Sequence, residues 1–162
     1  TAQNMWSNFQ ETVKIYKQGK AYYDALKSVH DLVKGARKVQ QTILLVGDIS
    51  DIYVTNFNTM TGDPNFTVEE LSAIAFGYNR LLKESSDLLL DLKEVTTATG
   101  LSMTDKERLD IINRIYGEVL EYKNLTWYYT RKNIGVSYLR SKEKGDAARV
   151  LSLYGTHEQR YW

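Results

Sequence analysis

Apolar residues recur at intervals of three and four over long stretches of this chain, and this spacing constrains the fold more than any other feature. The clearest seam comprises Leu71, Ile74, Tyr78, Leu81, Ser85, Leu88, Leu92 and Val95. Such steps place successive side chains along one side of an α-helix, as in helices that pack lengthwise on one another. Ser85 is the one polar member, and we interpret it as a small residue that the seam tolerates. The spacing predicts a helix from 67 to about 97.

Two threonine–glutamate pairs indicate where helices begin. Thr67 is followed three residues later by Glu70, and Thr104 is followed in the same way by Glu107. In this capping box the threonine side chain accepts a bond from the glutamate N–H, and the glutamate side chain reaches back to the threonine N–H. We therefore expect helix starts near 67 and near 104.

The segment before the only proline carries a similar stripe from about 3 to 60. Gly19, Gly35 and Gly47 interrupt it, and we expect a bend or short break near Gly35 or Gly47, because glycine weakens a helix. The turn TGDPN at 61–65 ends the segment. The stretch SDIYVTNF at 50–57 also has the composition of a strand, although helical spacing runs through it.

The segment after Thr104 predicts a third long helix, to about Glu143. One apolar stripe comprises Leu109, Ile112, Tyr116 and Val119, and a second comprises Ile111, Ile115, Tyr122, Leu125 and Tyr129. Two adjacent stripes are expected of a helix buried against two others. Gly145 then predicts a break, followed by a short helix from Asp146 to Tyr154 that Gly155 caps.

These segments together predict an all-α fold, an elongated antiparallel three-helix bundle with a short C-terminal helix. The 162 residues suit one domain, and we expect a single helical-bundle domain over 1–162. The chain contains no cysteine, which excludes disulfides, thiolate metal sites and a cysteine nucleophile. It also lacks a run of about 20 apolar residues of the kind that spans a bilayer.

Residues with the potential for catalysis or metal binding are scattered. The two histidines, His30 and His157, lie far apart and in no metal-binding motif, so we expect no catalytic residue, metal, cofactor or small-molecule substrate. Asp48 and Asp51 lie three residues apart, a spacing that suits a cation or an acid–base pair. The simpler interpretation is that Asp48 caps a helix that restarts after Gly47, while Asp51 faces water.

A basic cluster occupies 140–149, preceded by Arg131 and Lys132. Basic residues near Trp127, Tyr128 and Tyr129 are a pattern found in proteins that bind single-stranded nucleic acid. The alternative is a solvated helix end, since cations favour a helix C-terminus. The net charge of the chain is only +1, so nucleic acid is an unlikely main partner.

Aromatic residues concentrate in TWYYT at 126–130 and in RYW at 160–162. Tyrosine and tryptophan suit protein interfaces, because one edge of the ring can be buried while its polar atom stays wet. The alternative places these rings at the boundary of a thin bundle. The candidate partner-binding residues are Trp127, Tyr128, Tyr129, Tyr161 and Trp162.

Several blocks, taken in order, resemble a known family. They are NFQETVKIYKQGKAYYDALKSV, GDISDIYV, NFTVEELSAI, GLSMTDKERLDII, and VSYLR followed by LYG and RYW. Together they cover nearly the whole chain and resemble the TraI-like conjugal transfer proteins encoded in conjugative transposons of Bacteroidetes. A looser similarity links the expected shape to minor pilins of type IV secretion systems.

The resemblance implies a protein that carries an N-terminal signal peptide and is exported to the periplasm or cell envelope. The chain begins at Thr1, which is consistent with a removed leader. The implied function is a non-enzymatic structural or assembly component of a conjugative DNA-transfer apparatus. Its implied partners are other conjugal transfer proteins, and it would meet the membrane only indirectly. A nucleic-acid-binding accessory protein of conjugal transfer is the alternative.

Overall fold

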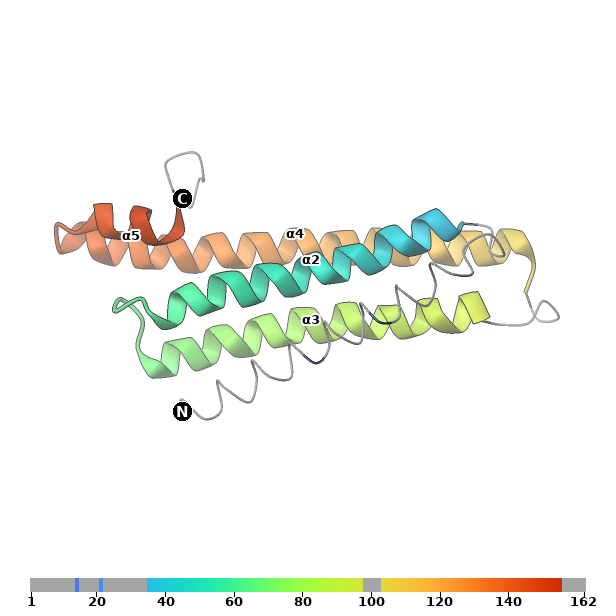
Figure 1. Ribbon diagram of the computed structural model, residues 1–162, viewed down its shortest axis with the longest axis horizontal. Helices are drawn as coiled ribbons and strands as arrows, with labels where there is room; N and C mark the ends of the chain where they lie inside the picture. Colours follow the sequence, from blue (N-terminus) through green and yellow to red (C-terminus); the bar gives the residue numbers. More distant parts are fainter. Residues whose placement is uncertain (1–13, 15–20, 22–34, 98–102, 156–162) are drawn as a thin grey trace.

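Long helices laid side by side form the described part of the protein. The computed structural model describes residues 14, 21, 35–97 and 103–155. Within the two long ranges the elements are α2 (Ala36–Thr61), α3 (Val68–Thr97), α4 (Asp105–Glu143) and α5 (Ala147–Tyr154), and these ranges contain no strand. Helices α2 and α4 run in one direction and α3 runs in the other (Figure 1). The predicted all-α, elongated three-helix bundle with a short C-terminal helix is confirmed.

Both predicted helix starts are confirmed by their hydrogen bonds. The Glu107 N–H donates to Thr104 Oγ1 at 3.1 Å, and the Thr104 N–H donates to Glu107 Oε2 at 2.9 Å. The Glu70 N–H likewise donates to Thr67 Oγ1 at 3.2 Å, immediately before α3. These bonds satisfy backbone donors that the first turn of a helix leaves without an intrahelical partner.

The break in the first segment lies at Gly35 and not at Gly47. Gly35 has a φ of 83°, a left-handed conformation that side chains disfavour, and α2 begins at the next residue. Helix α2 continues through Gly47, so the proposed restart capped by Asp48 is wrong, as is the strand alternative for 50–57. The predicted helical stretch from residue 3 to residue 34 lies outside the described residues, apart from Lys14 and Ala21.

The predicted end of the bundle is also confirmed. Helix α4 runs to Glu143, Gly145 turns the chain with a φ of 72°, and α5 follows to Tyr154. Because α4 is the longest helix, it extends past the end of α2, and α5 folds back along this extension (Figure 1). None of the helices in the described ranges is long and apolar enough to cross a membrane.

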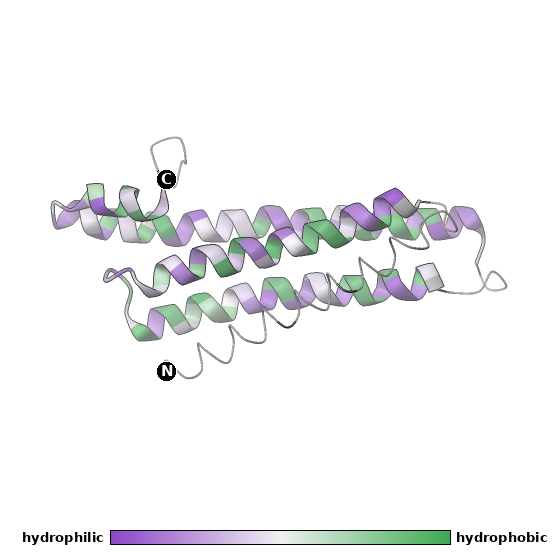
Figure 2. Cartoon of the chain, in the orientation of Figure 1, coloured by the Kyte–Doolittle hydropathy of each residue, from purple (hydrophilic) through white to green (hydrophobic). Residues whose placement is uncertain are grey.

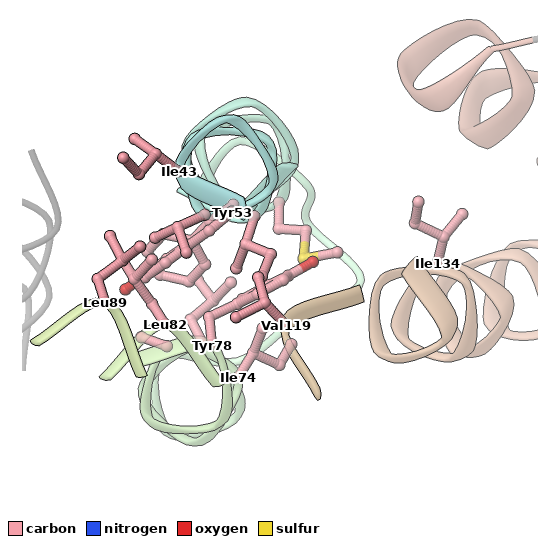
Figure 3. Packing of buried hydrophobic residues seen from close by; sticks show 14 of the residues in the cluster. Ile43, Tyr53, Ile74, Tyr78, Leu82, Leu89, Val119 and Ile134 are labelled. Atoms are coloured by element: carbon pink, nitrogen blue, oxygen red, sulfur yellow. The ribbon is translucent and has the colours of Figure 1, made fainter. Parts of the chain in front are cut away.

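One hydrophobic core joins the four helices, and tyrosines lie at its centre. The rings of Tyr53 and Tyr78 stack with centroids 4.7 Å apart, and Tyr129 meets Tyr78 edge to face at 4.9 Å. Figure 3 shows Tyr53 from α2 and Tyr78 from α3 in the space between the helices, with Val119 from α4 beside them. Of the predicted α4 stripes, Ile112, Ile115 and Val119 are buried. The core therefore forms along the predicted seams in the first half of α4.

A pair of glycine substitutions tests how closely α4 approaches α3. A Cβ added at Gly77 would overlap the Tyr129 hydroxyl and lie 2.5 Å from its ring carbon Cζ, whereas a Cβ at Gly117 meets nothing within 4 Å. We expect Gly77→Ala to destabilise the fold by about 1–3 kcal/mol, because the ring must move. Gly117→Ala should stabilise it by up to about 1 kcal/mol through helix propensity. Urea unfolding of both variants measures the difference, and equal effects would contradict the packing described.

The buried phenol of Tyr78 makes stability depend on alkaline pH. Burial raises the pKa of Tyr78 well above its ordinary value of 10.0. Since the folded state holds this proton more tightly than the unfolded chain, the stabilisation is complete below pH 10 and is lost as pH rises above it. Unfolding free energies measured above pH 10 should fall more steeply for the wild type than for Tyr78→Phe, by up to about 1.4 kcal/mol per pH unit. Identical slopes would contradict this assignment.

Candidate interaction surface

The structure separates the aromatic residues that the sequence grouped together. Trp127 and Tyr128 are exposed on α4. Tyr129 points inward, where its hydroxyl donates to the Ile74 carbonyl at 3.0 Å and its ring meets Tyr78. Tyr129 is thus a partly buried residue that packs against the core. Tyr161 and Trp162 lie outside the described residues.

The second half of α4 buries several hydroxyl side chains and exposes several large apolar ones. Its buried residues include the hydroxyl side chains Thr126, Thr130, Ser137 and Ser141. Its exposed residues include large apolar side chains, namely Leu125 at 49%, Tyr128 at 55%, Val136 at 40% and Leu139 at 58%. The prediction that Leu125 lies on a buried stripe is wrong, and Leu109, at 37% exposed, is also not buried as predicted.

Buried hydroxyls are tolerated because the helix backbone satisfies them. Thr126 Oγ1 donates to the Tyr122 carbonyl at 2.7 Å, and Thr130 Oγ1 donates to the Thr126 carbonyl at 2.8 Å. With its donor satisfied within the helix, Thr126 presents mostly a methyl group to the core. Thr130 Oγ1 also bonds to the buried hydroxyl of Tyr78 at 2.5 Å. These small residues let α4 approach α2 and α3, which leaves the larger apolar residues on the opposite face.

The exposed residues form a continuous line that we call the α4 outer stripe. It consists of Leu125, Tyr128, Lys132, Val136 and Leu139, spaced at steps of three and four. This is the spacing of a helix face that packs along another helix. Lys132 places its ammonium 5.3 Å from the centre of the Tyr128 ring, so the two side chains form a cation–π pair on the surface. Figure 2 shows hydrophobic and hydrophilic residues mixed along the whole of α4.

Charged residues flank the outer stripe at both ends. Toward the start of α4, Arg114 and Glu118 form an ion pair at 3.0 Å, with Glu121 exposed nearby. Toward the end of α4, Lys142 and Glu143 are both exposed. An apolar line with charged ends resembles the seam of a coiled coil, where charges set orientation.

A buried polar network holds the second half of α4 in place, and sequence reasoning missed it. Asp63 and Asn65 are buried in the turn between α2 and α3. Asp63 Oδ2 accepts from Ser137 Oγ at 2.5 Å and from Tyr154 OH at 2.8 Å, so one carboxylate joins the turn to α4 and α5. Asn65 Nδ2 donates to Ser141 Oγ at 2.6 Å. The available signal was that Asp63 and Asn65 flank the only proline, since Asp and Asn side chains often bond within turns.

Several cations of the basic cluster are engaged within the protein. Arg140 pairs with Glu70 at 2.5 Å and also donates to the Asn65 carbonyl at 2.7 Å. This contact lowers the pKa of Glu70. Lys144 donates to Asn65 Oδ1 at 3.1 Å, and Arg149 pairs with Asp146 at 2.8 Å. These groups fasten the end of the bundle, which leaves less positive charge for a polyanion.

The carboxylate pair on α2 is not organised as a cation site. Asp48 forms an ion pair with Lys123 of α4 at 3.1 Å, while Asp51 is exposed, as predicted. Partial burial raises the pKa of Asp51, and the negative charge of the neighbouring Asp48 raises it further. No group of three or more histidine, cysteine or acidic side chains suited to a metal occurs among the described residues. Asp48 therefore serves to connect α2 with α4.

In comparisons with known proteins, no family model, no curated protein and no solved structure matches the chain. Among the described residues, the outer stripe of α4 is the candidate interaction surface.

Proposed function

We propose that this protein is a non-enzymatic structural or assembly component of a conjugative, type IV secretion DNA-transfer apparatus, exported to the periplasm or cell envelope. It would act by binding other transfer proteins through the α4 outer stripe. The genetic setting rests on the sequence blocks that resemble conjugal transfer proteins. Minor pilins offer a looser parallel.

The observation that carries the proposal is the line of exposed apolar side chains on α4. Leu125, Tyr128, Val136 and Leu139 stay exposed although α4 has smaller residues that it buries instead. Single exposed apolar side chains are ordinary, but a line of them at helical spacing indicates a surface that another protein covers. Tyrosine, which is enriched at such contacts, occurs on this line at Tyr128.

A pull-down from membranes of cells that carry the transfer element tests the proposal. Tagged wild-type protein should recover other transfer proteins, and the double variant Leu125→Glu/Leu139→Glu should lose them. Phe76→Glu is the matched control, because Phe76 is 69% exposed and lies on a different helix, α3. Recovery of no transfer protein by the wild type, or equal recovery by the stripe variant, would contradict the proposal.

A nucleic-acid-binding accessory protein remains the second candidate. One observation favours it: Arg131 and Lys132 are exposed beside Trp127 and Tyr128, and bases stack on such rings. Binding to single-stranded DNA measured across a salt series tests it, because counterion release makes such binding strongest at low salt. Absence of binding at low salt would remove this candidate.

A further inference from the structure

The occupant of the α4 outer stripe can be inferred from the order of its residues. We propose that a second copy of this chain covers the stripe, with the two α4 helices packed antiparallel about a two-fold axis that crosses the stripe midway between Tyr128 and Lys132. This inference rests on the proposed function in one respect, namely that the stripe is a contact surface. It adds the identity and the orientation of the partner.

The stripe has the geometry of a helix-to-helix contact. Leu125, Tyr128, Lys132, Val136 and Leu139 advance by three and four residues, the period of interlocking helices. They remain exposed although α5 already lies along the same end of α4 (Figure 1). From Arg114 to Glu143 this face is about 44 Å long at 1.5 Å per residue, enough for a partner helix to lie along it.

In antiparallel packing the stripe of one copy faces the stripe of the other with complementary residues opposite each other. Around this axis, Tyr128 of one copy meets Lys132 of the other, and Leu125 meets Val136. In a two-fold contact each such pair occurs twice, once on each side of the axis. The Tyr128 ring and the Lys132 ammonium already attract each other within one chain at 5.3 Å. The second copy would bring the same two partners together at the centre of the interface.

The charges at the ends of the stripe favour the same orientation. In the antiparallel arrangement Glu118 lies level with Lys142 of the second copy. This is a pair of opposite sign, and the two-fold axis makes it occur twice. A parallel arrangement would instead set Lys132 against Lys132 and Glu118 against Glu118, and like charges across a helix interface repel. Charge complementarity therefore selects a two-fold, antiparallel pair.

Cysteine crosslinking tests the orientation cleanly, because the chain contains no cysteine. The double variant Leu125→Cys/Val136→Cys should form a covalent dimer under mild oxidation. Within one chain these positions are about 17 Å apart along α4, too far for a disulfide. Leu125→Cys alone should stay uncrosslinked, since the two copies of residue 125 lie far apart when the helices run in opposite directions.

Controls and contrary outcomes follow from the same design. A double variant with cysteines at Phe76 and Leu90, both exposed on α3, measures crosslinking by random collision. Crosslinking of Leu125→Cys alone as efficient as that of the double variant would indicate a parallel pair and overturn the proposal. Crosslinking of Leu125→Cys/Val136→Cys no better than that of the α3 control would also overturn it.

Sedimentation of the full chain measures self-association without a crosslink. Over a series of concentrations the wild type should reach twice the mass of the 18.7 kDa chain. Leu139→Glu should weaken self-association at least about tenfold, because residue 139 lies level with Glu121 of the second copy and the new carboxylate would face one of like charge. Circular dichroism should show an unchanged fold, since residue 139 is 58% exposed. A wild type that remains a single copy at every concentration would contradict the proposal.

The outcomes distinguish this proposal from the proposed function. If the wild type is a single copy but the stripe variants still lose transfer proteins in the pull-down, the second-copy proposal is wrong and the proposed function stands. If the antiparallel dimer forms but no transfer protein is recovered, the proposed function is wrong and the second-copy proposal stands.

Discussion

Replacement of Asp63 by alanine should destabilise the protein by about 3–5 kcal/mol, because it leaves several buried donors without an acceptor. Asp63 is 2% exposed and accepts bonds from Ser137, Tyr154 and the Asn65 N–H. Its loss would release the turn between α2 and α3 from both α4 and α5. Urea unfolding followed by circular dichroism measures the change in the free energy of unfolding.

An exposed carboxylate provides the control for this substitution. Asp87 on α3 pairs with Lys83 at 2.9 Å, and both side chains are more than half exposed. Since exposed pairs of this kind contribute little, Asp87→Ala should change stability by less than about 0.5 kcal/mol. A similar small effect for Asp63→Ala would show that the buried network does not hold the end of the bundle together.

Replacement of Tyr78 by alanine should cost about 3–5 kcal/mol, comparable to the loss of other large aromatic core residues. Tyr78 is fully buried, stacks on Tyr53 and meets Tyr129 edge to face. Its hydroxyl also bonds to Thr130 Oγ1 at 2.5 Å, which links α3 to α4. Removal of the side chain would therefore open a cavity where the three long helices meet.

Two smaller substitutions divide this effect between packing and hydrogen bonding. Tyr78→Phe keeps the ring and removes the hydroxyl, so it should cost about 1–2 kcal/mol. In the double variant Tyr78→Phe/Thr130→Val both partners are apolar, and the two costs should be less than additive. Thermal unfolding measures each variant. Full additivity, or a loss for Tyr78→Phe as large as for Tyr78→Ala, would contradict the roles assigned here.

Much of the fold could be predicted because local chemistry determines it. The Thr104 capping box, the break at Gly35 and the turn at Gly145 depend on residues within a few positions of one another. Seam spacing in α3 located Leu71, Ile74 and Tyr78 in the core. Predictions of this kind succeed because capping bonds and glycine conformations need no tertiary partner.

The second half of α4 was harder to predict because its hydroxyl side chains are buried with their hydrogen bonds satisfied inside the protein. Hydropathy places Thr126, Thr130 and Ser137 toward water, but bonds within the helix satisfy the first two, and Asp63 accepts the bond from the third. The buried residue at 63 lies 74 positions from Ser137 in sequence, so no local pattern reveals the contact. The assignment of Leu125 to a buried stripe was wrong because Thr126 and Thr130 lie on the core side of α4 and Leu125 does not.

The candidate site was predicted only in part for the same reason. The aromatic stretch TWYYT predicted a contact surface on the third long helix, and Trp127 and Tyr128 are exposed there in the structure. It turns Tyr129 inward, since helical geometry points adjacent residues in different directions. Val136 and Leu139 lie on the exposed line, whereas buried hydroxyl side chains occupy the core side of this part of α4.

Photocrosslinking in living cells tests most directly whether the outer face of α4 is the working surface of this protein. A photoreactive amino acid would replace either Tyr128 on the stripe or Phe76 on α3, in cells that carry the transfer element. We predict that position 128 crosslinks efficiently to a second copy of the chain or to another transfer protein, whereas position 76 does not. Efficient crosslinking at position 76 with none at position 128 would contradict the account.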